Sequence, residues 1–149
     1  DPEVLVAIRG LSTRTSTAGD VTGLNVADIS SINWNISEYS RAAGGTLSVT
    51  VNYNEEVDVT GTPQLTVVND SRADHTLSYA SGTGTNRLTF TLVIAAAHAS
   101  LQAGDVISIG ANAVSLNSGT VKEKGTNTNA TITSSAGIGT AAGTITAVA

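Results

Sequence analysis

The sequence predicts an all-β fold of antiparallel strands, arranged as a sandwich or a barrel. The first observation is an alternation of apolar and small polar residues at 47–53 and again at 88–94, the period of a strand with one buried face. The second is the composition, which is 40% hydrophobic but only 3% aromatic, so the core must come from Val, Leu, Ile and Ala. The third is the recurrence of expected strands about every 8 to 12 residues, with turn residues between them.

The expected strands can be placed in order along the 149 residues. A short apolar run at 3–9 is the first, and the polar stretch at 11–31 is expected to be a long surface loop. Alternation resumes at 32–36, which contains the single Trp. The later strands are expected at 47–53, 64–68, 76–80, 88–94, 106–109, 114–116 and 130–133. Residues 95–100 are expected to form one helical turn.

Charge and composition exclude several classes of function. Charged residues are 13% of the chain, about half the usual share, and the net charge is −5. Nucleic acid is not an expected partner, because its binding depends on clustered Lys and Arg, which are scattered here. The chain has no Cys, which removes disulfides and thiolate chemistry. No apolar run approaches the roughly 18 residues of a membrane span, so membrane insertion is not expected. The chain also has no Met, which suggests processing or truncation of the N-terminus.

No set of residues predicts an enzyme. His75 and His98 are the only histidines, and no Gly-x-Ser-x-Gly element accompanies them. Histidines in loops or on the surface are therefore the preferred interpretation. Two His residues without Cys or an HExxH helix also make a poor transition-metal site. We expect no catalytic residue and no cofactor.

One acidic cluster is a candidate calcium site. Glu55, Glu56 and Asp58 are close together in the sequence, and carboxylate oxygens are ligands that calcium prefers. Further oxygen ligands are available from Asn52, Asn54 and Asp105. The Asp-x-Asp-x-Asp spacing of a dedicated loop is absent, and the cluster precedes a Gly-Thr-Pro turn. A solvated strand end is therefore the preferred interpretation of these three residues.

Residues 46–133 resemble the bacterial immunoglobulin-like domains that recur in large surface adhesins and occur in phage structural proteins. The matching segments are TLSVTVNYNEEVDVTGTPQLTV (46–67), LSYASGTGTNRLTFTLVI (77–94), LQAGDVISI (101–109) and AVSLNSGTVKEKGTNTNATI (113–132). They contain an acidic pair followed by a Gly-Thr-Pro turn, and a Tyr-x-Ser-Gly-x-Gly element. The resemblance implies an immunoglobulin-like antiparallel β-sandwich with a structural or adhesive role. It carries over no catalytic residue.

The two ends of the chain depart from the family pattern. Residues 1–45 are expected to form an N-terminal strand, a long loop and an arm that lead into the core at 46–133. Residues 134–149 are an uncharged, β-prone tail without a counterpart in the family. Both ends are interpreted as extended arms that pair with open sheet edges of neighbouring subunits. The tail should therefore be removable without unfolding the core.

Three functions are compatible with these observations. The first is a non-enzymatic structural protein of a phage virion, a capsid decoration or tail-associated protein that contacts other copies of itself and neighbouring proteins by strand addition. The second is a repeat of a bacterial cell-surface adhesin or filament. The third is a carbohydrate-binding accessory module, which the scarcity of aromatic residues for an exposed platform disfavours and which specific glycan binding through Trp34 or Tyr39 would support. The expected location is a virion, the extracellular space or the cell surface.

Overall fold

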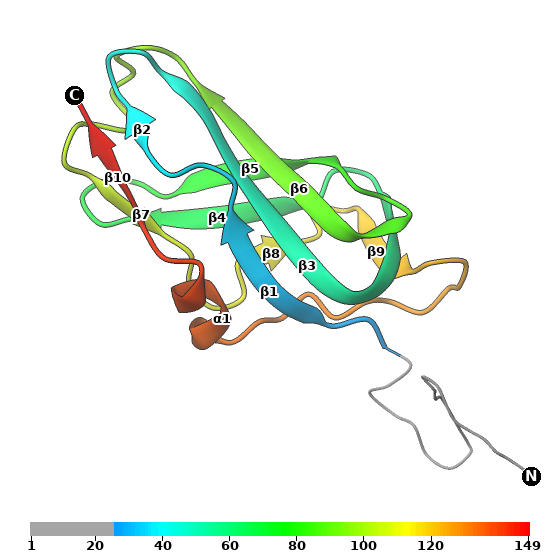
Figure 1. Ribbon diagram of the computed structural model, residues 1–149. Coiled ribbons are helices and arrows are strands. Elements are labelled where there is room, and N and C mark those ends of the chain that lie inside the picture. Colours follow the sequence, from blue (N-terminus) through cyan, green and yellow to red (C-terminus); the bar gives the residue numbers. More distant parts are fainter. Residues whose placement is uncertain (1–25) are drawn as a thin grey trace, which may run out of the picture.

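Ten strands and one short helix form from residues 26–149, the part of the chain that the computed structural model describes. The layer nearest the viewer in Figure 1 contains β1 (Ile29–Trp34), β3 (Gly45–Thr60) and β6 (Thr85–Ile94). Crossing behind it are β4 (Gln64–Asn69), β5 (His75–Ser81) and β7 (Val106–Ser108). The remaining elements are β2 (Tyr39–Ser40), β8 (Val114–Ser115), β9 (Thr120–Glu123), α1 (Ala136–Ala141) and β10 (Ile145–Val148). None of the helices in this part of the chain has the length and apolarity to cross a bilayer.

The strands belong to one curled sheet. Their order along it is β1-β3-β6-β5-β4-β7-β10-β2, while β8 pairs with β4 and β9 with β3. Each pair is antiparallel except β10 and β2, which run parallel. The sheet turns back at β5, which pairs with β6 on one side and β4 on the other. This brings the apolar faces of its two halves together (Figure 1). The prediction of an all-β fold is confirmed.

The core follows from the alternation seen in the sequence. Leu47, Val49 and Val51 of β3 are fully buried, while the residues between them lie on the outer face of the sheet. Phe90 of β6 pairs with Val49 and makes an edge-to-face contact with Tyr79, with ring centroids 6.1 Å apart. Aliphatic residues of β4, β5, β7 and β10 complete the same apolar cluster. Such burial contributes about 25 cal/mol per Å² of apolar surface removed from water.

Most of the predicted strands are confirmed, although their bounds differ. The alternating run at 32–36 becomes β1, the run at 47–53 becomes the longer β3, and the runs at 64–68, 76–80, 88–94, 106–109 and 114–116 become β4 to β8. Residues 130–133 form no strand, although two isolated backbone hydrogen bonds, from Ala130 N–H to Val121 and from Thr131 N–H to Ala27, hold them against other segments. Residues 95–100 form turns and not a helical turn. β2, β9 and α1 were not predicted, and β10 lies in the tail that was predicted only to be β-prone.

The expectation of an extended C-terminal arm is wrong. Residues 134–149 contain α1 and β10, and β10 pairs with β7 on one side and with β2 on the other. Ile145 and Ala147 are 4% and 2% exposed and belong to the core. The tail therefore completes its own sheet. At the other end, β1 and β2 fall within residues 26–45 and belong to that sheet too. The predicted strand at 3–9 and most of the predicted loop at 11–31 lie outside the described residues.

A buried glycine fixes the position of α1. Gly139 is buried, and a Cβ atom at this position would overlap the backbone carbonyl group of Ile109. Backbone atoms cannot move aside as a side chain does, so Gly139→Ala should lower the free energy of unfolding by about 1–3 kcal/mol. Gly137→Ala is the matched control, because its Cβ would meet only Ser135 Oγ at 3.8 Å. Urea denaturation that gives both variants equal stability would contradict this packing of α1.

Candidate functional site

Two of the three residues in the predicted acidic cluster, Glu56 and Asp58, contact the turn that follows β9. Glu56 Oε1 makes an exposed ion pair with Lys124 Nζ at 3.2 Å, and Asp58 Oδ2 accepts a hydrogen bond from Gly125 N–H at 3.0 Å. Both contacts hold the turn that follows β9 against the end of β3. Within residues 26–149, no three His, Asp or Glu side chains lie close enough together to hold a metal ion. These contacts give the acidic side chains a structural role in this part of the chain.

The three additional oxygen donors suggested for calcium lie in separate places. Asn52 Nδ2 donates to Ser31 Oγ at 3.0 Å, and Asn54 Oδ1 accepts from Asp28 N–H at 2.9 Å. Asp105 is buried in a different polar cluster. Asn52, Asn54 and Asp105 therefore do not lie together as ligands of one calcium site.

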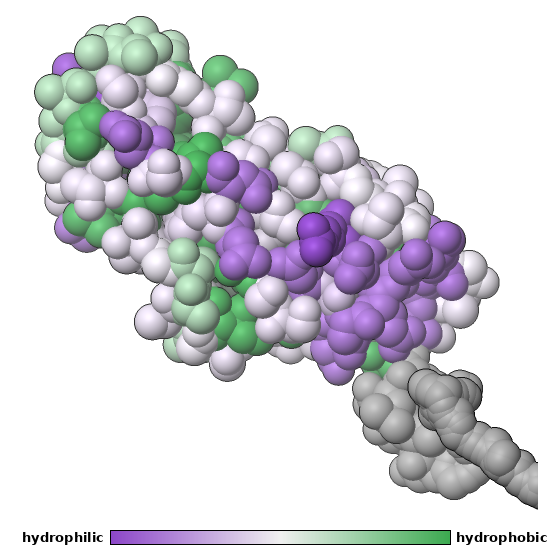
Figure 2. All heavy atoms as spheres, viewed as in Figure 1, coloured by the Kyte–Doolittle hydropathy of each residue, from purple (hydrophilic) through white to green (hydrophobic). Residues whose placement is uncertain are grey.

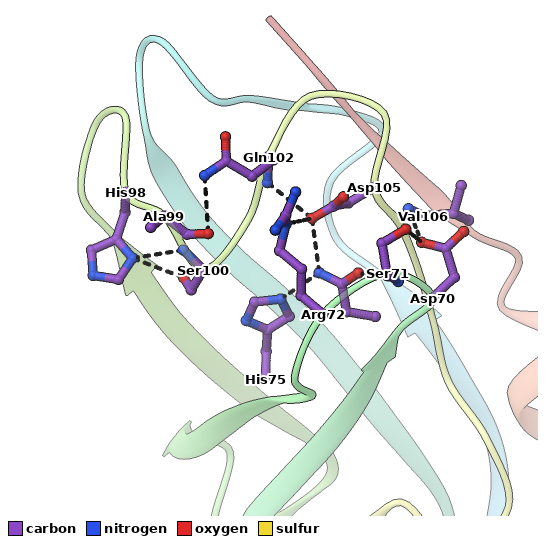
Figure 3. Close-up of polar contacts among 11 residues, drawn as sticks. Asp70, Ser71, Arg72, His75, His98, Ala99, Ser100, Gln102, Asp105 and Val106 are labelled. Carbon is purple, nitrogen blue, oxygen red and sulfur yellow. Dashed lines mark hydrogen bonds and ion pairs between the residues drawn. The ribbon is translucent and has the colours of Figure 1, made fainter.

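The two histidines are in different surroundings. His98 is exposed, and its Nδ1 accepts a hydrogen bond from Ser100 N–H at 3.1 Å. His75 is 5% exposed, and its Nε2 lies 3.1 Å from Asn69 Nδ2. Figure 3 shows the two rings on separate segments, each with its own partners. The prediction that both are surface or loop residues is wrong for His75, which begins β5 and is buried.

A buried polar cluster connects four segments of the chain. Asp105 Oδ2 accepts hydrogen bonds from Arg72 Nε at 2.9 Å, Gln102 N–H at 3.0 Å and Asn69 Nδ2 at 3.2 Å (Figure 3). Asn69 also lies against His75, as described above. These residues come from the end of β4, the loop after it, the start of β5 and the segment before β7. We refer to Asn69, Arg72, His75 and Asp105 as the buried polar cluster.

The buried polar cluster keeps its carboxylate charged. Burial of Asp105 acts to raise its pKa, but the hydrogen bonds from Gln102 and Asn69 and the charge and hydrogen bond of Arg72 outweigh burial and lower it. Asp105 also fixes backbone, because its carbonyl oxygen accepts from Ala147 N–H at 2.8 Å. A charged group with this many fixed partners is suited to stabilising the ends of β4, β7 and β10.

Protonation of His75 should weaken the fold. Burial lowers its pKa below the ordinary value of 6.5, although the charges of Asp105 and Asp74 oppose this. As the pH falls, His75 therefore takes up a proton in the unfolded chain before it does so in the folded chain. The stabilisation of the fold by neutral His75 is complete above pH 6.5 and declines as the pH falls below that value. We expect urea denaturation of the wild type to show lower stability at about pH 5.5 than at about pH 7.5. His75→Gln should flatten this dependence, and an unchanged dependence in that variant would contradict the role of His75.

A polar hollow lies on the outer face of β1, β3 and β6. Its volume is about 450 Å³, within the range of small-molecule sites. Hydrophilic residues gather over these strands on the face seen in Figure 2. We refer to this feature as the outer-face hollow. Its lining consists of Ser30, Ser31, Asn33, Asn35, Thr50, Asn52, Tyr53, Asn86 and Arg87.

Strand pairing places these residues in rows across the sheet. Asn52 is opposite Ser31 on β1 and Arg87 on β6, and Thr50 is opposite Asn33 on β1. Neighbouring strands are about 4.8 Å apart, so one row extends for about 10 Å over three strands. The outward positions of three strands thus form one continuous polar surface.

Hydrogen bonds within the outer-face hollow hold several of its side chains in place. Asn35 Nδ2 donates to Ser48 Oγ, and Asn35 Oδ1 accepts from Thr50 Oγ1, each at 2.9 Å. Asn52 is tied to Ser31, as described above, and Asn86 Nδ2 donates to the carbonyl oxygen of Tyr53 at 3.4 Å. A ligand would therefore meet polar groups whose orientation is already fixed, which lowers the entropy lost on binding.

The aromatic residues suggested for carbohydrate binding do not form an exposed platform. Tyr39 is 3% exposed and belongs to the core. Trp34 is partly buried against that core, and its Nε1 donates to the carbonyl oxygen of Gly143 at 3.2 Å. Both rings are used in packing, which is how β1, β2 and the C-terminal segment are joined.

Neither the buried polar cluster nor the outer-face hollow was predicted. Asn69 and Asp105 are 36 positions apart, and no local pattern connects them. The hollow did leave a signal, because Asn33 and Asn52 occupy polar positions within predicted strands and Arg87 directly precedes another. Recognising it requires the strand order, which the pattern alone does not supply.

Comparison with known proteins adds no family assignment. Neither a scan against protein-family models nor searches of curated proteins and of solved structures found a match for this chain.

Proposed function

We propose that this chain is a non-enzymatic structural module with an immunoglobulin-like β-sandwich fold, present in many copies in a surface assembly. The sandwich is supported by antiparallel strands in two layers around one aliphatic core and by the sequence resemblance at 46–133. The observation that carries the structural role is the position of the two ends. β1 begins near one end of the elongated body, and β10 runs to the C-terminus at the other (Figure 1). A module with this arrangement adds its full length to an assembly.

Within this class, a phage virion protein is the first candidate, either a capsid decoration or a tail-associated protein. It is favoured by the family resemblance, which includes phage structural proteins, and by the 45 residues that precede the resemblance at Thr46. A repeat of a bacterial cell-surface adhesin or filament is the alternative. The adhesin alternative is favoured by the positions of the start of β1 and the end of β10 at opposite ends of the body, because repeats joined end to end need their two ends far apart. The proposed location is a virion or the outer surface of a cell.

The proposed partners are other copies of the chain and neighbouring structural proteins. Strand addition requires an unpaired strand edge. The C-terminal strand cannot be the donor, because β10 already has β7 and β2 as neighbours. β1 and β2, the two strands at the ends of the sheet order, are the positions at which an incoming strand would extend the sheet.

Electron microscopy of the native source particle tests the proposal. The expected result is density for the domain at symmetric positions on a virion, in many copies. A fibre with copies joined end to end on a cell surface would select the adhesin alternative. The purified protein should also form oligomers at high concentration in light-scattering measurements. A protein that stays monomeric and is absent from any ordered surface array would overturn the structural role.

A further inference from the structure

The outer-face hollow contains one cation whose charge is not used within the described chain. Arg87 is exposed, and its guanidinium group makes no ion pair or hydrogen bond with any other residue among 26–149. Its backbone N–H is fixed by Thr85 Oγ1 at 3.1 Å. The other eight lining residues are uncharged at neutral pH. A guanidinium group that presents paired N–H donors in this setting matches the two oxygens of a carboxylate.

The rest of the lining has spare hydrogen-bonding capacity. The amide of Asn33 has no partner among the described residues, and Asn52 and Asn86 use their Nδ2 atoms but leave their Oδ1 atoms open. Ser31 Oγ accepts from Asn52 and retains its own proton for donation. These groups are neutral donors and acceptors spread around the single cation. They suit a ligand with several hydroxyl groups next to one anionic group.

Other ligand classes fit less well. The one aromatic ring in the lining belongs to Tyr53, which is 2% exposed and whose hydroxyl donates to the carbonyl oxygen of Thr131 at 3.0 Å. The hollow therefore lacks an apolar surface for a hydrophobic ligand. A polyanion would meet one cation on a chain with a net charge of −5, which opposes further negative charge. An inorganic anion would use Arg87 but not the amides and hydroxyls around it.

We propose that the outer-face hollow binds a carboxylated sugar residue, a hexuronic acid unit of a glycan, with Arg87 holding the carboxylate. Asn33, Asn52 and Asn86 contact the sugar hydroxyls. The binding is weak, with a Kd on the order of 1 mM, because the hollow is open and has no stacking ring. The proposal goes beyond the structural role and does not rest on it, since the hollow lies on the outer face of β1, β3 and β6 and not at an unpaired strand edge.

NMR titration of the full chain with methyl glucuronide tests this site. We expect the amide signals of residues 31–35, 50–52 and 86–87 to shift together and to saturate. Methyl glucoside, which lacks the carboxylate, should bind at least about tenfold more weakly, the factor expected for one charge-assisted pair. Acetate is the control for an anion without hydroxyls, and it should shift only the signals nearest Arg87.

Two variants separate the role of Arg87 from the overall charge of the protein. Arg87→Gln should weaken methyl glucuronide binding about tenfold or more, and Arg87→Lys should restore it only in part, because a lysine lacks the planar fork. Lys124→Gln removes the same charge from the turn after β9 and should leave the affinity unchanged. Equal binding of glucuronide and glucoside, equal binding of glucuronide and acetate, or no shift with any of the three would overturn the proposal. None of these results would affect the proposed role in a surface assembly.

Discussion

Deleting residues 134–149 is expected to abolish cooperative unfolding of the protein. The deletion removes the buried side chains of Ile145 and Ala147 and the hydrogen bonds that join β10 to β7 and β2. It also removes the carbonyl oxygen of Gly143 that Trp34 contacts. Loss of a whole buried strand exceeds the few kcal/mol that separate folded from unfolded states in a domain of this size. Thermal denaturation followed by circular dichroism should show no sigmoidal transition.

A pair of point substitutions in the same strand controls for this deletion. Ala147→Asp places a carboxylate in the apolar core without a compensating charge or hydrogen bond. This variant should unfold or lose most of its stability. Thr146→Asp introduces the same side chain at the next position, which is exposed, and should have little effect. If the truncated chain keeps a sharp transition, or if the two variants are equally stable, then β10 is not a core strand.

Asp105→Ala should lower the free energy of unfolding by about 3 kcal/mol. The substitution leaves the Gln102 N–H group and the Asn69 amide without their acceptor in a buried setting, and each such group costs about 1–3 kcal/mol. Arg72 contributes less to the loss, because its side chain is 43% exposed and its charge can return to water. Chemical denaturation of the purified variant measures the difference. Asp74→Ala, at an exposed position of the same loop, should change stability little.

The acid dependence of Asp105 provides a second readout. The pKa of Asp105 is lowered in the folded state. The ionised carboxylate therefore stabilises the fold fully above the ordinary pKa of 3.8, and this stabilisation is lost as the pH falls through the lowered value. Asp105→Asn keeps the shape of the side chain but cannot titrate. The stability difference between wild type and Asp105→Asn should therefore shrink as the pH falls below about 4. A difference that stays constant over that range would show that charge is not the source of the stabilisation.

The strands with regular alternation could be predicted because their pattern is local. Residues 47–53 and 88–94 have buried and exposed positions that alternate along one strand, and β3 and β6 follow that pattern. β9 escaped prediction because three of its four residues are polar or charged, and it pairs with the far end of an unusually long β3. β10 was recognised as β-prone, but the residues with which it pairs are 38 to 108 positions away. Nothing in the tail itself shows whether those partners belong to the same chain.

The candidate sites depended even more on long-range structure. The buried polar cluster combines residues from four segments, and the environment that lowers the pKa of Asp105 exists only after those segments meet. The outer-face hollow requires β1 and β6 to flank β3, which is a fact of topology and not of any single strand. In the acidic cluster, Glu56 and Asp58 contact the turn after β9, which is 68 and 67 positions away, and their local pattern does not reveal this long-range contact.

The pairing of β10 also determines how the domain would respond to mechanical force. β10 runs along the long direction of the body toward the C-terminus, while the described chain begins near the other end (Figure 1). A pull between the two ends therefore acts along β10, across the perpendicular hydrogen bonds of its antiparallel pair with β7 and the slanted bonds of its parallel pair with β2. Bonds loaded in this way must break together and not one after another. The four residues of β10 thus act as a clamp that resists extension of the domain under tension.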